Sequence, residues 1–109
     1  MGFGTILGMH NLRTFLKQFA EAISSRKDIE VHSQEYRANA KLKAAGFAPG
    51  LSELTISKNG EVLYEIDATD DEGYSAGGKK EHEAYERLNR AIDKGEMESA
   101  LSALDELCK

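Results

Sequence analysis

The chain has 109 residues, of which 40% are hydrophobic and 30% charged, and its formal net charge is −5. These values predict one globular domain that buries roughly 65% of the surface of the unfolded chain. The single Cys108 excludes an intrachain disulfide and favours a reducing, cytoplasmic compartment. No apolar run approaches the roughly 20 residues of a membrane span, so we expect no contact with a membrane.

Charge is distributed unevenly along the chain. Residues 1–60 carry eight Lys and Arg against five Asp and Glu, a net +3, whereas residues 61–109 carry six against fourteen, a net −8. Opposite charges in the two halves can attract each other within one molecule or between copies. The acidic total argues against nucleic acid as a partner, because phosphate binding requires many basic side chains on one surface. The alternative is nucleic-acid binding through the basic half, with one face formed by Arg37, Lys41 and Lys43.

The first ten residues are rich in Gly and lack the basic start and hydrophobic stretch of a secretory signal. We expect residues 1–10 to form a flexible N-terminal extension and residues 11–109 to form a single α+β domain. Asn11 is the expected cap of a first helix that ends near Ser25. A continuous apolar stripe predicts its buried side: Leu12, Phe15, Leu16, Phe19 and Ile23. The polar side is expected to carry Arg13, Lys17, Gln18 and Glu21.

The segment after this helix fits two patterns. Ile29–Val31 alternates and predicts a short strand, and the alternation of apolar residues continues through Ser33–Ala45. The same segment also carries a helical apolar stripe. We favour the helix, because Ala is the best helix former and is depleted in strands. The strand alternative gives a three- or four-stranded antiparallel meander, which is a different architecture.

Leu54–Ile66 contains the strongest hairpin signal, because two alternating apolar runs flank Asn59-Gly60. A two-residue turn pairs Lys58 with Glu61 and separates the apolar residues of the two strands onto opposite faces. A three-residue loop pairs Ser57 with Glu61 and gathers them on one face. We predict the three-residue loop, because a buried face should select the register. The buried face then comprises Leu54, Ile56, Val62, Tyr64 and Ile66, with Leu63 on the second face.

The C-terminal part predicts an acidic, Gly-rich loop over Asp67–Gly78 and two helices, Lys79–Asp93 and Glu96–Leu107. Lys94-Gly95 is a good helix stop, and so short a link predicts an antiparallel helical hairpin. The expected inward positions are Ala84, Tyr85, Leu88, Ala91, Ile92, Met97, Ala100, Leu101, Leu104 and Leu107. The fold class is therefore predicted to be α+β, with the central hairpin in a small antiparallel sheet packed by the N-terminal helix and the helical hairpin.

His32, Glu35 and Tyr36 are the best candidates for an acid–base site. They lie where a strand is expected to meet a helix, a position that often borders a cleft. General acid–base catalysis needs such groups within hydrogen-bond reach and with matched pKa values. A single histidine at the boundary of an element is more often structural, so we keep the trio as an alternative and favour a protein that is not an enzyme.

Other motifs give weaker indications of chemistry. Asp67, Asp70 and Asp71 form an acidic loop, but its spacing does not match a calcium-binding loop, and we expect a solvated turn and no metal site. His82–Glu86 lacks the second histidine of a zinc helix and predicts an exposed His–Glu pair. Tyr74–Lys80 lacks phosphate-loop spacing and predicts a mobile lead-in to the next helix. We therefore expect no cofactor.

These observations favour a small soluble, acidic interaction or accessory protein. It is expected to act through self-association or through a protein partner with a basic surface. A small sheet leaves a face and an edge uncovered, and a second copy of the chain is the commonest cover, so we expect a homodimer. The alternative is a small enzyme or ligand-binding domain with its site near His32, Glu35 and Tyr36.

Overall fold

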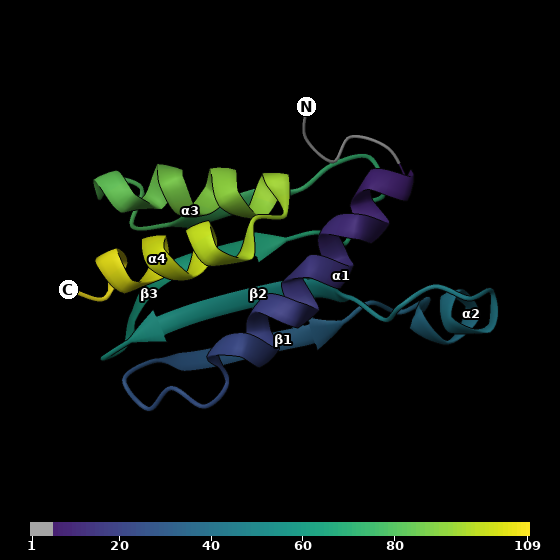
Figure 1. The fold of residues 1–109 in the computed structure, drawn as a ribbon, viewed down its shortest axis with the longest axis horizontal. Coiled ribbons are helices and arrows are strands. Elements are labelled where there is room, and N and C mark those ends of the chain that lie inside the picture. The colour runs from purple at the N-terminus through teal and green to yellow at the C-terminus, as the bar shows by residue number, and fades with distance from the viewer. Residues whose placement is uncertain (1–5) are drawn as a thin grey trace.

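A computed structural model describes residues 6–109 as helices packed on one side of an antiparallel sheet (Figure 1). The elements are α1 (Ile6–Ile23), β1 (Glu30–Glu35), α2 (Asn39–Ala44), β2 (Leu51–Lys58), β3 (Glu61–Asp67), β4 (Ser75–Gly78), α3 (Glu83–Lys94) and α4 (Met97–Leu107). The four strands lie in the order β1-β2-β3-β4, and each neighbouring pair is antiparallel. The predicted α+β fold, with an N-terminal helix and a C-terminal helical hairpin against the sheet, is confirmed.

Helix α1 starts earlier than the sequence predicted. It begins at Ile6, and both Met9 and His10 are buried, so a cap at Asn11 and a flexible extension that includes residues 6–10 are wrong. Residues 1–5 lie outside the described part of the chain. Burial of Met9 one turn before Leu12 outweighs the local capping preference of Asn11. The predicted apolar stripe of this helix is confirmed, because all five of its members are buried.

The hairpin combines features of both registers considered for it. Asn59 and Gly60 have φ values of 53° and 81°, so the turn has two residues and pairs Lys58 with Glu61. The predicted three-residue loop is wrong. A bulge then inserts Leu63 into β3, which restores the alignment of the apolar residues. Leu54, Ile56, Tyr64 and Ile66 are buried together as predicted.

The bulge also exchanges two side chains relative to the prediction. Leu63 is only 2% exposed and belongs to the core, whereas Val62 is half-buried outside it. The predictions that Leu63 lies on the second face and that Val62 lies in the core are therefore both wrong. The carbonyl of Leu63 accepts a hydrogen bond from Lys79 N at 3.0 Å, so the inserted residue keeps a backbone partner.

Ser33–Ala45 contains parts of both predicted structures. Its first residues complete β1, which ends at Glu35, and only Asn39–Ala44 is helical. The favoured helix over the whole segment is wrong, because β1 gains ladder hydrogen bonds with β2 that outweigh local propensity. Helix α2 has no buried residue, so there the helix propensity of alanine decides the structure.

The C-terminal part follows the prediction except at two points. All five inward residues predicted for α3 are buried, and Gly95, at φ 70°, ends this helix as predicted. Helix α3 begins later than Lys79, because His82 caps it by accepting a hydrogen bond from Ala84 N at 3.1 Å. His82 is thus a cap and not a partner of Glu86. Ser75–Gly78, expected to belong to a loop and mobile lead-in, instead pairs with β3 as strand β4.

The core lies between the sheet and the helices α1, α3 and α4, which all cover the same side of the sheet (Figure 1). The buried apolar side chains form one cluster to which all three helices and the two central strands contribute. Within residues 6–109, no helix combines the length and the apolar character that crossing a bilayer demands. Among the described residues, no helix lies over the opposite side of the sheet, and this side is called the open face below.

Candidate functional site

The open face carries an excess of acidic side chains. Strand alternation places there the residues that neighbour the buried positions of β1, β2 and β3. The exposed side chains of this face are Glu30, His32, Gln34, Glu53, Glu65 and Asp67. No Lys or Arg is among the described strand residues of this face, since Lys58 reaches the other side, where its Nζ donates to the carbonyl of Cys108. The open face is therefore a negatively charged surface.

Two of these carboxylates are directly opposed. Glu53 and Asp67 are cross-strand partners in the ladder between β2 and β3. Like charges in this position destabilise a sheet. Asp67 Oδ1 accepts a hydrogen bond from Thr69 N at 3.0 Å, and the Thr69 backbone and hydroxyl hold the pKa of this carboxyl below its usual value. Asp67 is therefore ionised at neutral pH.

A hollow of about 280 Å³ lies on the open face where β2, β3 and β4 adjoin. Its rim includes the three carboxylates of Glu53, Glu65 and Asp67. Gly77 of β4 leaves room for one of them, because a Cβ at this position would come within 3.2 Å of Glu65 Oε2. A hollow of this size and charge suits a single cationic side chain.

Arg13 ties α1 to the loop that follows β3. Although it was expected on the polar side of α1, its side chain is only 2% exposed. Nε donates to the carbonyl of Ala68 at 2.7 Å, while Nη2 donates to the carbonyl of Asp70 at 3.0 Å and to Asp71 Oδ1 at 2.8 Å. The Tyr36 ring lies 3.8 Å from the guanidinium carbon. Arg13 thus joins three segments that are distant in the sequence.

Tyr36 and Asp71 complete this cluster. The Tyr36 hydroxyl donates to Asp71 Oδ1 at 3.0 Å. Hydrogen bonds from Arg13 and Tyr36 lower the pKa of Asp71, and burial together with Asp71 raises the pKa of Tyr36. At neutral pH the cluster therefore holds a guanidinium, a carboxylate and a protonated phenol, an arrangement that stabilises the fold and leaves no free base.

Replacing Asp71 with Asn should destabilise the fold by about 1 kcal/mol at neutral pH, because it removes the charge from the Arg13 hydrogen bond. The pKa of Asp71 is lower in the folded protein than in the unfolded chain, so its contribution is complete above about pH 4 and is lost as pH falls through the folded value. Urea unfolding of both proteins at several pH values measures the difference. A gap that stayed constant down to the lowest pH would contradict this assignment.

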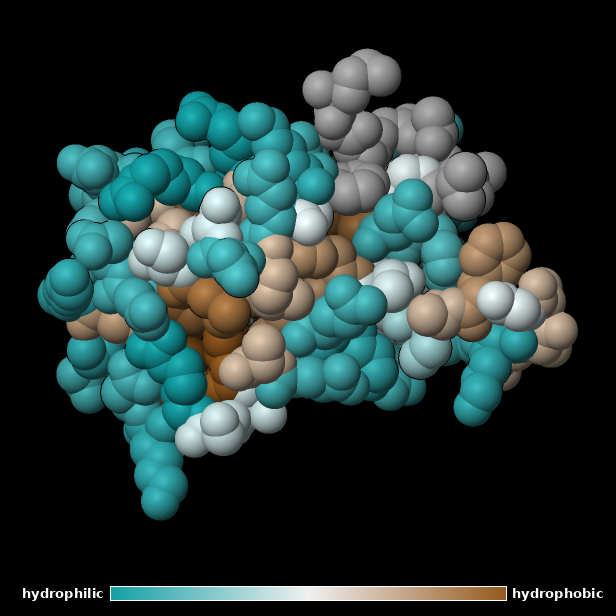
Figure 2. Space-filling view, viewed as in Figure 1, coloured by the Kyte–Doolittle hydropathy of each residue, from teal (hydrophilic) through white to brown (hydrophobic). Residues whose placement is uncertain are grey.

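The segment between Tyr36 and Gly50 projects from the end of the sheet as a small unit, called the α2 lobe (residues 37–49; Figure 1). A short neck closes it: Tyr36 N donates to the carbonyl of Gly50 at 3.0 Å, and the Asn39 amide makes one bond to each backbone group of Gly50, at 2.9 and 3.0 Å. The charged residues of the lobe are all basic: Arg37, Lys41 and Lys43. Figure 2 shows apolar surface at this end of the molecule, where Phe47 is 42% exposed.

The structure separates the three predicted acid–base residues. His32 lies on the open face opposite Thr55, whereas Glu35 Oε2 lies 3.6 Å from Lys17 Nζ on the helix side. Glu35 and Tyr36 both line a hollow of about 640 Å³ at the end of β1 and β2, but His32 does not. Two of the three residues are therefore brought together, and each of these two already has a polar partner.

The predicted metal candidates are likewise engaged by their neighbours. Asp70 Oδ1 accepts a hydrogen bond from Glu72 N at 2.9 Å, Asp67 binds Thr69 N, and Asp71 binds Arg13. In residues 6–109, no group of three or more His, Cys, Asp or Glu side chains is arranged to hold a metal ion. These carboxylates shape the loop after β3.

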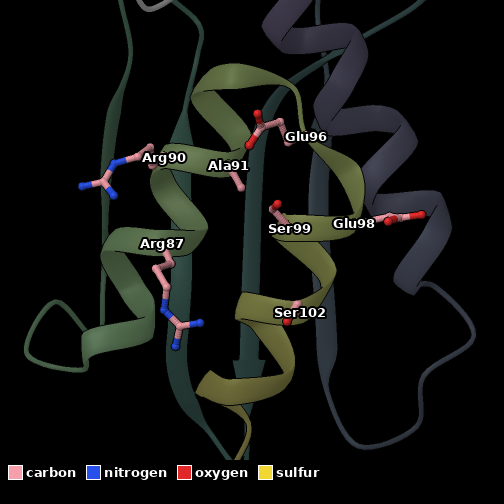
Figure 3. A pocket seen from close by; sticks show the side chains of 7 residues that line it. All are labelled: Arg87, Arg90, Ala91, Glu96, Glu98, Ser99 and Ser102. Atoms are coloured by element: carbon pink, nitrogen blue, oxygen red, sulfur yellow. The ribbon is translucent and has the colours of Figure 1, made fainter.

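A further hollow of about 400 Å³ runs between α3 and α4 (Figure 3). Arg87 and Arg90 of α3 and Ser99 and Ser102 of α4 line it, and Figure 3 shows Arg90 pointing away from α4. Arg87 lies 3.5 Å from Glu83 of its own helix. Because the lining groups do not converge on one point, this furrow is a weaker candidate than the open face.

Comparison of the chain with protein-family models, with curated proteins and with solved structures gives no match. The open face and the α2 lobe are the two surface features of opposite charge. Sequence reasoning located the basic residues of the lobe but not the acidic face, since Glu53, Glu65 and Asp67 come together only through the register of β2 and β3. Their alternation with buried residues was the available signal.

Proposed function

We propose that the protein is a small interaction protein of the cytoplasm that binds a protein partner with a basic surface through its open face. The observation that supports this proposal is the direct opposition of Glu53 and Asp67 on exposed sheet surface, where the described strand residues of the face include no Lys or Arg. Such an arrangement costs stability, and a surface that costs stability in the free protein is typical of a binding site.

Charge also decides which partner fits. Two open faces brought together would place carboxylates against carboxylates, so a symmetric dimer through this face is disfavoured. A partner that presents Lys or Arg would neutralise the face and be attracted to it over a distance of about 10 Å at moderate salt. The hollow bordered by Glu53, Glu65 and Asp67 supplies the point at which one cationic side chain is held.

The experiment uses a short extended peptide of alternating Lys and Thr, followed by NMR at low protein concentration. We expect the largest amide shifts in β2 and β3, and about tenfold weaker binding when Glu53, Glu65 and Asp67 are replaced by Gln, Gln and Asn. Asn at position 67 keeps an oxygen for Thr69 N, so the loop should be unaffected.

Two controls make the result specific. A matched variant neutralises three exposed carboxylates outside the face, Glu81, Glu86 and Glu98, and should bind almost as well as the unaltered protein. A peptide with Glu in place of Lys should not bind. The proposal would be wrong if shifts were spread over the helices or if both triple variants weakened binding equally.

A second candidate function is binding of a small polar ligand in the hollow at the end of β1 and β2. The observation in its favour is a volume of about 640 Å³ lined by Glu35, Tyr36, Arg37 and Glu53, which offers both charges to a zwitterion. NMR titration with free amino acids tests it. Shifts confined to this hollow would support it, and unchanged spectra would remove it.

A further inference from the structure

We infer that the first basic partner of the open face is a second copy of the same chain, whose α2 lobe docks there in a head-to-tail contact. This inference rests on the proposed function, because it requires the open face to bind basic surfaces. It joins two features of opposite charge, the open face and the α2 lobe, which adjoin on one molecule at the hollow lined by Glu53 and Arg37.

The lobe has the composition of a docking element. All of its charged side chains are basic and exposed, and none of them belongs to an ion pair among the described residues. Phe47 is the most exposed large hydrophobic side chain of the described chain, and it rests against His10 with the ring centroids 4.9 Å apart. An exposed aromatic among unpaired cations is typical of an interface centre with a charged rim.

The open face carries the acidic side chains that the lobe lacks. Among the described strand residues of the face there is no Lys or Arg, and three of its carboxylates border its hollow. The neck at Gly50 fixes the lobe to the end of β1 and β2, so the lobe is anchored on the molecule that carries it. The acidic open face of one copy therefore complements the basic α2 lobe of another copy.

The contact uses different surfaces on the two copies. Each molecule that offers its lobe keeps its own open face free, so the association continues as an open chain or closes as a ring. A contact made by one small lobe is smaller than a standard interface, and we expect affinity in the micromolar to millimolar range. Because the attraction is ionic and exposed, it should weaken at high salt.

Sedimentation velocity of the full chain, up to about 1 mM, tests the inference. The face variant carries Glu53→Gln, Glu65→Gln and Asp67→Asn; the lobe variant carries Arg37→Gln, Lys41→Gln and Lys43→Gln. We expect the unaltered protein to grow in size with concentration at low salt and each variant alone to remain monomeric. An equimolar mixture should form a dimer and nothing larger, because the intact lobe of the face variant binds the intact face of the lobe variant.

A control variant for the lobe neutralises Lys27, Lys80 and Lys94. These side chains are exposed and belong to none of the ion pairs of the described residues. The control variant should associate as the unaltered protein does. A strict monomer at every concentration, association that survives in either variant, or a mixture that stays monomeric would each overturn the inference. The proposed function is tested separately by binding of the Lys-Thr peptide to the open face. Peptide binding without self-association would therefore overturn the inference and leave the proposed function supported.

Discussion

Replacement of Arg13 with Met should lower the free energy of unfolding by about 3 kcal/mol, the largest effect expected of a single side chain outside the apolar core. The substitution keeps much of the volume of the side chain but removes every hydrogen bond that it donates. The carbonyl of Ala68, a fully buried residue, loses its 2.7 Å bond to Nε, and Asp71 loses its cation. Urea unfolding followed by circular dichroism measures the change.

The matched control is Arg87, which is exposed and, within residues 6–109, forms its ion pair with Glu83, at 3.5 Å, four residues earlier in its own helix. Arg87→Met should change the stability by less than about 0.5 kcal/mol, because exposed pairs of this spacing contribute little. Equal effects of the two substitutions would contradict the role given to Arg13. Tyr36→Phe is expected to lie between them, since it keeps the ring over the guanidinium and loses only the hydroxyl.

Gly50→Ala should destabilise the protein by about 3 kcal/mol through steric overlap. A Cβ at this position would lie 2.6 Å from Arg13 Cβ and 2.7 Å from the Arg13 backbone carbon. These atoms belong to a buried helix and cannot move aside as the tip of a flexible side chain would. Either α1 moves away from the sheet or the neck of the α2 lobe opens.

Gly73→Ala is the control for this prediction. Nothing lies within 4 Å of a Cβ at Gly73, and its φ is not in the left-handed region. The substitution should be neutral or slightly stabilising, because Ala restricts the unfolded chain. Thermal unfolding of both variants measures the comparison, and similar melting temperatures would show that the close approach of Gly50 to α1 is unimportant.

The long amphipathic segments were predictable because one local pattern determines them. Leu12, Phe15 and Leu16 in α1, and Leu88 and Ile92 in α3, repeat at helical spacing, and the sequence-based assignment of their buried side is confirmed. The stop at Gly95 was equally local, since glycine adopts the left-handed conformation without strain. In these segments, burial and propensity favour the same structure.

The errors occur where distant residues decide the structure. Ser75–Gly78 looks like a loop by composition and becomes a strand only because β3 offers an unpaired edge. The bulge at Leu63 could not be read from alternation, because a turn preference and a burial preference conflict there and one inserted residue satisfies both. The prediction that Arg13 lies on the polar side of α1 is wrong, because its hydrogen-bond partners, the carbonyls of Ala68 and Asp70, are more than fifty residues away in the sequence.

The candidate site was predictable only in part. Tyr36, predicted as an acid–base candidate, and Asp71, considered as a metal candidate, do meet in the structure, where both contact Arg13. The acidic open face depends on the pairing of Glu53 with Asp67, and therefore on a register that the turn and the bulge set jointly. A surface created by register cannot be recognised before the register is known.

The neck at Gly50 brings the two ends of the α2 lobe together. Tyr36 and Gly50 are joined by a 3.0 Å hydrogen bond, so the chain leaves and re-enters the body of the protein at almost the same point. Residues 40–49 can therefore be exchanged for a foreign peptide of similar or greater length without stretching the sheet, because Asn39 keeps its two bonds to Gly50. This makes the tip of the lobe the natural place for an inserted reporter.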